Sequence, residues 1–492
     1  MKREYLLFVL TLYLSFDTFH KVSAHTQTTD LNLTDSVDSI YYVKKDWLKA
    51  GVITFGVNMG VWAFDRYIQK GDFAYISWKT VRENFRKGFI WDNDYMGTNL
   101  FLHPYHGNLY YNAGRSNGLN YWESGALALA GSAMWELFME CEYPSTNDII
   151  ATPIGGMALG EVFFRTSDLI LDDRTTGSSR FGRELAAFIV SPTRGLTRII
   201  NGDIRRKKST SGRRFGLPEL YIELSTGLRV LELKTPIIDK GFGVATNINI
   251  EYGDIFETEQ ERAYDYFSLR GNLNGQGSQP LLSQLNICGR LYSTGLVDTS
   301  NDLLNLGIYQ HFDYYDSDTI SNISIGVPYR FGTPASFGLG FVHKSKRFKN
   351  WDIRSYLHGN CILLGASLSD YYVVKDRNYN LASGFSWKFG TIFSYKDFIN
   401  FSLINEVYRL FTWKGYAEDI DWNTINEKTL NAQGDHSQAV LNVFSLRADL
   451  RLRRKLYLTG IYYNYTRDTN YRYFDNVYSN TSEGRLMLTY RF

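Results

Sequence analysis

The stretch that decides the fold is Thr481-Ser-Glu-Gly-Arg-Leu-Met-Leu-Thr-Tyr-Arg-Phe492. Successive side chains of a β-strand point to opposite faces, so residues two apart share a face. One face carries Leu486, Leu488, Tyr490 and Phe492, and the other carries Arg485, Met487, Thr489 and Arg491. The stretch therefore predicts a strand with one apolar face and one mostly polar face.

The same period of two begins near residue 215 and recurs along the chain, clearly in residues 220–230, 244–252 and 440–453. A soluble β-sandwich also alternates, but spanning strands need about 9 to 11 residues, and the stripes are that long. Bacterial barrels have even strand numbers. At roughly 20 to 25 residues per strand and connection, residues 215–492 therefore predict a closed antiparallel transmembrane β-barrel of about twelve strands, within a range of 10 to 14. Charged positions such as Arg447, Asp449 and Arg485 are expected to line its lumen.

Long connections are expected outside the cell, because the longer loops of such barrels usually lie there. The candidates are residues 254–262, 316–322, 416–437 and 468–479.

The last strand ends on an aromatic carboxyl-terminal residue and so resembles the terminal strand of bacterial outer-membrane β-barrels. In those proteins this strand is the membrane insertion signal. The resemblance implies that Tyr490 and Phe492 form that signal here. It also implies two partners, the barrel-insertion machinery and outer-membrane lipid.

The amino terminus predicts export. Lys2 and Arg3 precede an apolar stretch over residues 5–16, and Val22-Ser-Ala24 supplies the small residues of a cleavage site. This is the layout of a secretory signal peptide, predicted over residues 1–24. Residues 25–42 are polar and predict a flexible lead-in.

Composition excludes some classes of protein. The net charge of +2 is too small for a nucleic-acid-binding footprint. Aromatic residues make up 16% of the chain, which suits the aromatic girdles of membrane barrels. The three cysteines, Cys141, Cys288 and Cys361, show no paired spacing and are expected to be small buried residues.

Residues 43–204 predict a helical domain rich in small residues, periplasmic or partly in the lumen. Helices are expected over residues 47–68, 122–139 and 147–172. Each contains charges that would be costly against lipid. Gly156 and Gly160 are spaced for close helix packing. The basic run of residues 205–214 predicts a solvated linker before the barrel domain of residues 215–492.

Several motifs recur in order in the helical domain: His103-Pro-Tyr-His-Gly, Gly131-Ser-Ala-Met-Trp-Glu136, Thr152-Pro-Ile-Gly-Gly-Met-Ala-Leu-Gly-Glu161 and Ser191-Pro-Thr-Arg-Gly195. Over residues 45–200 this series resembles a domain-of-unknown-function family (DUF3943-like) of Gram-negative outer-membrane proteins. The resemblance implies location and architecture in the cell envelope. It implies no activity.

Two short motifs invite a chemical reading. His103 and His106 could share a metal ion, but Pro104 disfavours a regular helix there and no third ligand is near in sequence. We therefore expect no metal and no cofactor. Ser145 and Asp148 have the spacing of a capping box, so a helix start is expected rather than a nucleophile with its partner.

The remaining candidates could form a polar cluster in which buried carboxylates beside histidine do acid–base work. Its members are His103, His106, Arg115, Glu123, Glu136, Glu161 and Arg165. The leading hypothesis is an outer-membrane barrel with a structural, binding or transport-like role and no assigned catalysis. The alternatives are an outer-membrane enzyme acting on lipid or other envelope material through this cluster, and a gated or plugged pore. The sequence specifies neither substrate nor oligomeric state.

Overall fold

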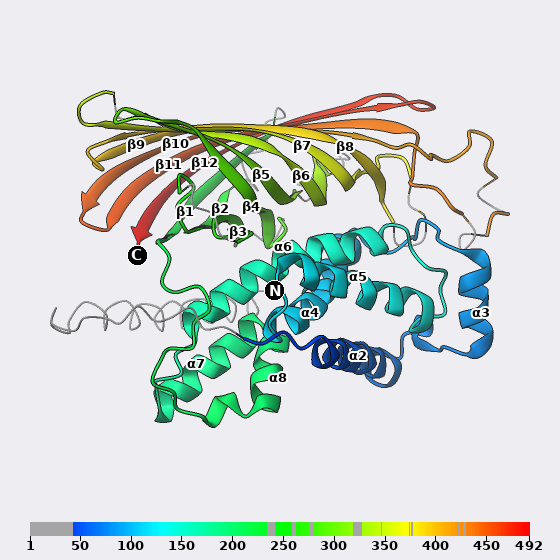
Figure 1. Ribbon diagram of the computed structural model, residues 1–492. Coiled ribbons are helices and arrows are strands. Elements are labelled where there is room, and N and C mark those ends of the chain that lie inside the picture. Colours follow the sequence, from blue (N-terminus) through cyan, green and yellow to red (C-terminus); the bar gives the residue numbers. More distant parts are fainter. Residues whose placement is uncertain are drawn as a thin grey trace. The chain divides into compact units, whose positions relative to one another are not determined.

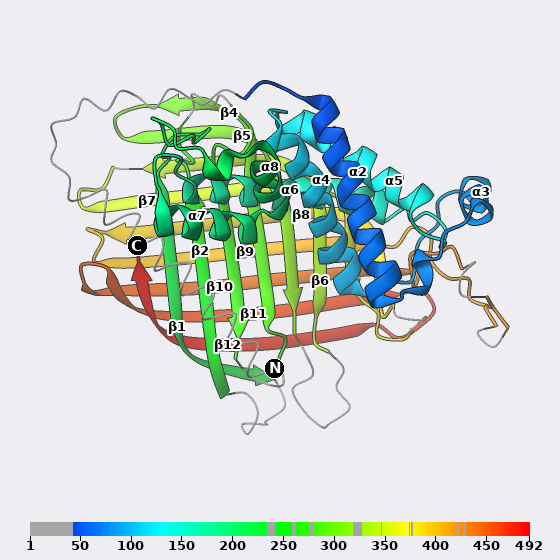
Figure 2. The same ribbon diagram turned by 90° about the horizontal axis from the view of Figure 1, so that it is seen from below.

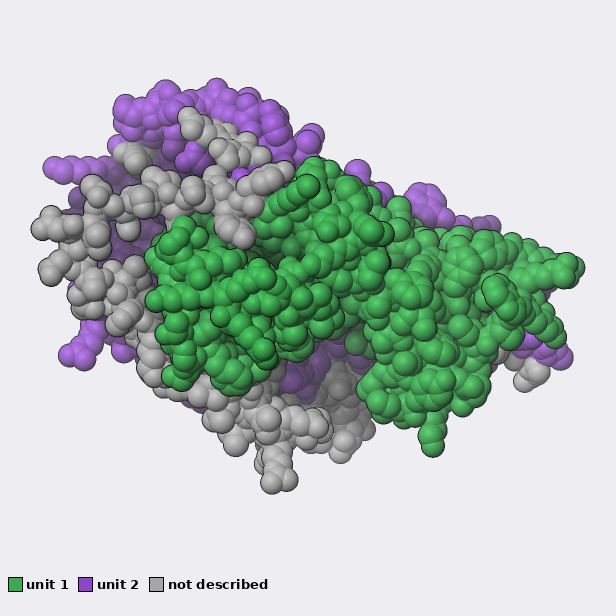
Figure 3. Space-filling view, turned by 60° about the horizontal axis from the view of Figure 1, so that its bottom comes forward, with its two compact units in different colours: residues 1–89, 102–218 green, residues 90–101, 219–492 purple. Residues whose placement is uncertain are grey.

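The computed structural model describes residues 43–233, 242–257, 262–275, 279–317, 327–345, 347–372, 374, 377–421, 424–426 and 430–492. The predicted signal peptide and lead-in, residues 1–42, lie outside the described residues. The chain forms two compact units, coloured separately in Figure 3. The helical unit comprises residues 1–89 and 102–218, and the barrel unit comprises residues 90–101 and 219–492.

The described part of the helical unit contains seven α-helices (Figure 1). They are α2 (Trp47–Phe64), α3 (Trp78–Lys87), α4 (His103–Ser116), α5 (Tyr121–Phe138), α6 (Asp148–Ile170), α7 (Gly177–Val190) and α8 (Pro192–Asn201). Short 3₁₀ or π turns cover Asp65–Gln69, Asp72–Ala74, Thr98–Leu102 and Asp203–Arg205. Helices α2, α5 and α6 confirm the three expected from the sequence. Among the described residues, none of the helices is both long and apolar enough to cross a bilayer.

Glycine sets the spacing of α4, α5 and α6. A Cβ atom at Gly107 of α4 would lie 1.7 Å from the carbonyl oxygen of Thr152 in α6, and one at Gly156 would lie 2.7 Å from the Cα of Gly107. The two backbones are therefore in direct contact. Gly160 faces the ring of Tyr111, where an added Cβ would approach to 2.6 Å. The expectation that Gly156 and Gly160 allow close helix packing is confirmed.

The basic run of residues 205–214 is only in part the solvated loop expected from the sequence. Arg205, Arg206 and Lys207 are exposed, as expected. Ser211 and Arg213 are buried. Lys208 pairs with Asp173 at 2.9 Å, and the backbone N–H of Arg214 donates to Asp168 at 2.8 Å. Its second part, residues 208–214, lies against the carboxyl-terminal part of α6 and the residues after it, where carboxylates balance its charge.

The barrel unit is a closed antiparallel barrel, which confirms the predicted fold. Its order is β1-β12-β11-β10-β9-β8-β7-β6-β5-β4-β3-β2, so each strand pairs with its sequence neighbours and β1 closes on β12 (Figure 2). The twelve strands in the described residues are β1 (Leu220–Leu233), β2 (Phe242–Tyr252), β3 (Phe267–Asn274), β4 (Leu282–Asp298), β5 (Asp302–Asp316), β6 (Arg330–Ser345), β7 (Trp351–Leu368), β8 (Tyr379–Tyr395), β9 (Ile399–Phe411), β10 (Ser437–Arg453), β11 (Leu456–Tyr471) and β12 (Val477–Arg491).

The two faces of the barrel wall differ in chemistry, as the alternation predicts. Arg485 and Arg447 point inward and are buried or nearly so. The outward positions are apolar and exposed over much of the wall. They include Leu228, Val230, Val244, Leu339, Phe341, Leu357, Trp387, Phe389, Phe393, Phe401, Leu446, Leu450, Leu458, Tyr462, Leu486 and Leu488. In a soluble protein the apolar side chains face inward and the polar ones outward. Here the arrangement is reversed, as expected for a barrel wall that faces hydrocarbon.

Consecutive connections alternate between the ends of an antiparallel barrel. We call the end at which β1 begins and β12 finishes the terminal end. The connection from β2 to β3, residues 253–266, lies at this end, whereas those after β5, β9 and β11 lie at the opposite end. Placing all four long connections on one side was therefore wrong for residues 254–262.

Residues 90–101 join the barrel unit at the opposite end. Arg377 Nη1 donates to the carbonyl of Asp92 at 2.6 Å, and the Tyr379 hydroxyl donates to that of Asp94 at 2.9 Å. Phe101 packs edge-on against Tyr314 with ring centroids 4.5 Å apart. This segment covers part of the outer face of β5, β6 and β8 near their ends there.

Candidate functional site

Three members of the predicted polar cluster meet at Glu161. Its carboxylate is fully buried on α6 and accepts from Arg115 Nε at 2.8 Å and Nη2 at 3.0 Å. Arg165 Nε adds a bond of 2.8 Å, and the Tyr111 hydroxyl one of 2.7 Å. Burial opposes ionisation of Glu161, yet the two guanidiniums outweigh it and lower the carboxyl pKa. A carboxylate held ionised and saturated with donors has little capacity left to accept a substrate's proton.

His106 lies elsewhere, between α4 and α5. Its ring packs edge-on against Trp135 and bonds the Tyr110 hydroxyl through Nε2 at 2.7 Å. That hydroxyl donates to the side-chain amide oxygen of Asn58 in α2, so His106 Nε2 must be the donor in its own bond. Burial, assisted by neighbouring His103, lowers the pKa of His106 to about 3. The ring is therefore neutral at physiological pH and links three helices.

His103 begins α4 and Glu136 lies in the last turn of α5, and both contact residues around the start of α6. His103 Nε2 lies 3.5 Å from the carboxylate of Asp148, and Glu136 accepts from the backbone N–H of Ser145 at 2.7 Å. Ser145 Oγ accepts from the N–H of Asp148 at 3.2 Å, which is one half of the expected capping box.

Glu123 forms a complete capping box with Asn120 at the start of α5 and pairs with Lys45 at 2.7 Å. These hydrogen bonds lower its carboxyl pKa. The predicted cluster is thus divided: Arg115, Glu161 and Arg165 are in contact with one another, whereas Glu123 contacts Lys45 and Asn120, and Glu136 contacts Ser145.

A different site stands out in the barrel lumen. A cavity of about 720 Å³ lies toward the terminal end, lined entirely by residues of the barrel unit. Charged, amide and aromatic side chains from the inner faces of many strands meet there. Such a mixture of apolar surface and a few convergent polar groups is typical of small-molecule sites.

An ion-pair network lines the cavity beside the two chain ends of the barrel. Glu223 of β1 accepts from Arg447 of β10 and, at 3.2 Å, from Arg491 of β12. Asp449 accepts from the same two arginines at 2.9 and 3.1 Å. Tyr457 lies against the Arg491 guanidinium, 3.8 Å from ring centroid to Cζ. Two carboxylates and two guanidiniums alternate along this part of the cavity wall, so their charges balance one another.

A second network lies deeper in the cavity. Lys388 of β8 reaches Asp313 of β5 at 2.6 Å. Glu406 of β9 accepts from Arg270 of β3 and from the Tyr315 hydroxyl. These pairs cross the lumen between strands that are not neighbours.

Beyond these pairs the lumen is packed. Aromatic and aliphatic side chains from the inner faces form a buried core that includes Tyr315, Tyr329, Phe331, Tyr408, Leu410, Leu441, Tyr463 and Tyr465. Tyr329 stacks on Tyr465 with centroids 4.6 Å apart. Arg229 and Arg485 both pair with Glu483 in this layer. A packed layer of inward side chains therefore lies between the cavity and the opposite end of the barrel.

The sequence drew attention to Arg485, Arg491, Arg447 and Asp449 as inward charges, and the structure places them in the lumen. It did not single out Lys388, Asp313, Glu406 or Arg270. The sequence could have indicated that these side chains point inward, because each falls on the polar face of an alternating stretch. It could not have indicated their ion pairs, since Lys388 and Asp313 lie 75 residues apart and Arg270 and Glu406 lie 136 residues apart.

Residues 88–193 match the family described as Domain of unknown function (DUF3943). The resemblance inferred from the ordered motifs is thereby confirmed over these residues. No curated protein matches the sequence of this chain.

The solved structures that match the chain include outer-membrane porins and channels. The NanC porin in a rhombohedral crystal form is 10% identical, with 56% of this chain and 100% of that chain covered and a TM-score of 0.26. In-vitro folded OmpT, an outer membrane protein of Vibrio cholerae, is 9% identical, with 56% and 97% covered and a TM-score of 0.24. The CymD monoaromatic hydrocarbon channel is 9% identical, with 56% and 89% covered and a TM-score of 0.23. These TM-scores are too low to carry an argument, and the chain's own strand pairing defines its fold.

Proposed function

We propose that the barrel spans the bacterial outer membrane and binds a small molecule in its lumen cavity. Support for the membrane location comes from the outer wall, where apolar side chains are exposed on strand after strand. Burying each of these side chains in hydrocarbon would contribute about 1.5 to 3 kcal/mol. A closed barrel leaves no unpaired sheet edge in the bilayer.

The location has a direct test in cell fractionation combined with gel mobility of unheated and heated samples. We expect the protein in the outer-membrane fraction, with a folded form that migrates differently after heating. Phe492→Ser should reduce the folded form severalfold, because it removes the terminal aromatic ring, while Phe492→Tyr should retain it. A soluble periplasmic protein would overturn the proposed location.

One observation supports binding over open passage: the cavity ends at a packed layer of aromatic side chains and buried ion pairs. An open porin has a water-filled lumen. A ligand that enters the cavity at one end of the lumen would be stopped by the packed core beyond it, so this arrangement favours binding over passage. The mixed charges of the chamber favour a polar ligand that carries both hydrogen-bond donors and acceptors.

Planar-bilayer recording tests the closed lumen. The purified full chain should show no steady conductance. Tyr408→Ala combined with Tyr465→Ala removes two rings from the packed layer and should produce measurable channel openings. Phe401→Ala combined with Leu446→Ala, which shortens outward side chains, should leave the bilayer silent. Steady conductance of the unaltered protein would contradict a closed chamber and favour a pore.

A further inference from the structure

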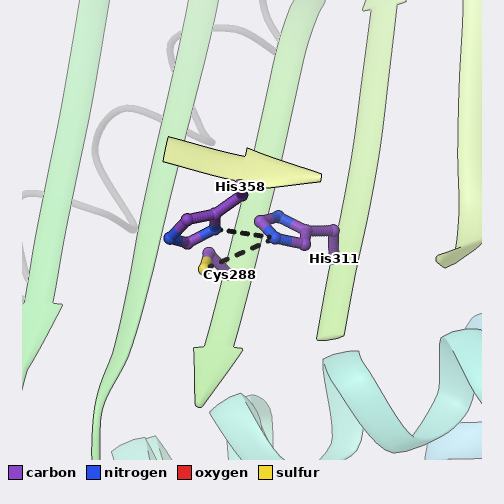
Figure 4. A group of neighbouring side chains, drawn as sticks. All are labelled: Cys288, His311 and His358. Carbon is purple, nitrogen blue, oxygen red and sulfur yellow. Dashed lines mark hydrogen bonds between the residues drawn. The ribbon is translucent and has the colours of Figure 1, made fainter. Parts of the chain in front are cut away.

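Three side chains with metal-binding atoms converge on the wall of the lumen cavity: Cys288 of β4, His311 of β5 and His358 of β7 (Figure 4). Cys288 Sγ lies 3.9 Å from His311 Nε2, and His311 Nε2 lies 3.1 Å from His358 Nδ1. All three ligand atoms lie within 4.8 Å of one another. Both histidines are almost fully buried, whereas Cys288 is partly exposed and borders the cavity.

Barrel geometry brings these residues together. Cys288 and His311 are direct cross-strand partners. His358 belongs to the strand after next, so its ring must cross β6 to reach His311. Its partner on β6 is Gly340, where a Cβ atom would lie 2.4 Å from the His358 ring. Tyr309 stacks on that ring with centroids 4.3 Å apart. The missing side chain at Gly340 therefore makes room for His358 to lean toward His311.

The hydrogen bonds define which nitrogens carry protons. Lys388 Nζ lies 3.1 Å from His311 Nδ1 and can only donate, so the His311 proton resides on Nε2. His311 Nε2 then donates to His358 Nδ1, which leaves the His358 proton on Nε2. Among the described residues, no hydrogen-bond partner faces that buried Nε2. His358 thus turns an unprotonated nitrogen toward Cys288 and His311.

We propose that Cys288, His311 and His358 bind a divalent late transition-metal ion of the Zn²⁺ class in the cavity of the proposed binding barrel. One thiolate and two imidazoles suit such an ion. Tetrahedral bonds of about 2.0–2.1 Å to nitrogen and 2.3 Å to sulfur place ligand atoms roughly 3.3–3.6 Å apart. The two distances of 3.1 and 3.9 Å bracket this range. The fourth position faces the cavity, which gives the ion an entry path and room for a water or ligand.

Binding moves two protons. The Cys288 thiol releases its proton to water as the metal–sulfur bond forms. His311 transfers its proton from Nε2 to Nδ1 as Nε2 becomes a ligand, while His358 binds through Nδ1 without changing tautomer. Lys388 then loses its acceptor at His311 and keeps its ion pair with Asp313. Lys388 therefore competes with the metal both as a positive charge and as a donor to Nδ1.

The ligand residues are far apart in sequence, 23 positions between Cys288 and His311 and 47 between His311 and His358. No spacing motif could therefore indicate the site. The only pair weighed from the sequence, His103 and His106, belongs to the helical unit.

The test titrates the chelator-treated full chain in detergent with Zn²⁺ by calorimetry and with Co²⁺ by absorption. We expect one Zn²⁺ per chain. Co²⁺ should give the visible bands of tetrahedral coordination and a thiolate-to-cobalt charge-transfer band. Cys288→Ser should abolish that band, and His358→Gln should weaken Zn²⁺ binding at least about a hundredfold, since even second-shell losses cost 10- to 100-fold. Heat-modifiable mobility verifies that each variant is folded.

Matched controls separate the site from the other cysteines and from the lumen charge. Cys141→Ser and Cys361→Ser should leave the charge-transfer band and the affinity unchanged. Lys388→Met should tighten Zn²⁺ binding about tenfold or more. Stoichiometric binding that survives in both Cys288→Ser and His358→Gln, or the lack of any Co²⁺ charge-transfer band, would overturn the site. Neither result depends on membrane location or conductance, so failure here is distinguishable from failure of the proposed function.

Discussion

Gly107→Ala is expected to destabilise the helical unit by about 3 kcal/mol or more, the upper part of the range for overpacked cores. The added Cβ would lie 1.7 Å from the Thr152 carbonyl oxygen and 3.2 Å from the Gly156 Cα. Both neighbours are backbone atoms of α6, so no side-chain rotation can relieve the overlap. Helices α4 and α6 must separate, and the buried contacts of Tyr111 and Arg115 with Glu161 would weaken with them. Urea titration of the full chain, followed by helical circular dichroism, measures the loss.

Gly182→Ala in α7 is the matched control. It makes the same substitution inside a helix of the same unit, but no atom lies within 4 Å of the added Cβ. Alanine should stabilise the helix there by about 0.5 to 1 kcal/mol, because glycine loses more backbone entropy on folding. If Gly107→Ala and Gly182→Ala had the same effect, helix contact through glycine would not explain the fold of this unit.

The elements that follow from local pattern could be predicted from the sequence. Alternation predicted the barrel, since each strand needs only its own residues to define two faces, and the length of residues 215–492 predicted about twelve strands. Small residues and caps gave α2, α5 and α6. The basic run of residues 205–214 shows the limit: its charge is visible in the sequence, but its partners Asp168 and Asp173 are visible only once α6 is in place.

The candidate sites could not be predicted for the same reason: their residues come together only in the folded chain. A closed barrel brings together residues of β4, β5, β7 and β8 whose order in the chain carries no spacing signal. Cys288 was expected to be a small buried residue, yet it is partly exposed, and Cys361 is exposed on the outer wall. The predicted polar cluster gathered residues by chemical type, and the helices distribute those residues among caps, a helix junction and the buried ion pairs of Glu161.

Glu161→Gln is expected to destabilise the helical unit by about 3 to 5 kcal/mol, the usual cost of removing one partner from a buried ion pair. Arg115 and Arg165 would remain buried and would lose the carboxylate that both of them contact. Arg165 lies 4.0 Å from the Phe215 ring centroid, a contact too weak to replace an ion pair. Glu123→Gln is the control. It removes a carboxylate of the same unit at the more exposed start of α5, where the loss should be about 1 kcal/mol or less.

The pH dependence of stability identifies the cause of that loss. The pKa of Glu161 is lowered in the folded chain, so its stabilisation is complete above the unfolded value near 4.5 and disappears as pH falls through the lower folded value. The difference between the parent and Glu161→Gln should therefore be constant from pH 8 to 5 and shrink in more acidic solution. Adding Arg165→Met to Glu161→Gln should recover part of the stability, because it removes a buried charge that has lost its ion pair with Glu161 and leaves an apolar side chain of similar length. A double variant less stable than Glu161→Gln alone would mean that Arg165 stabilises the unit through packing on Phe215 rather than through its charge.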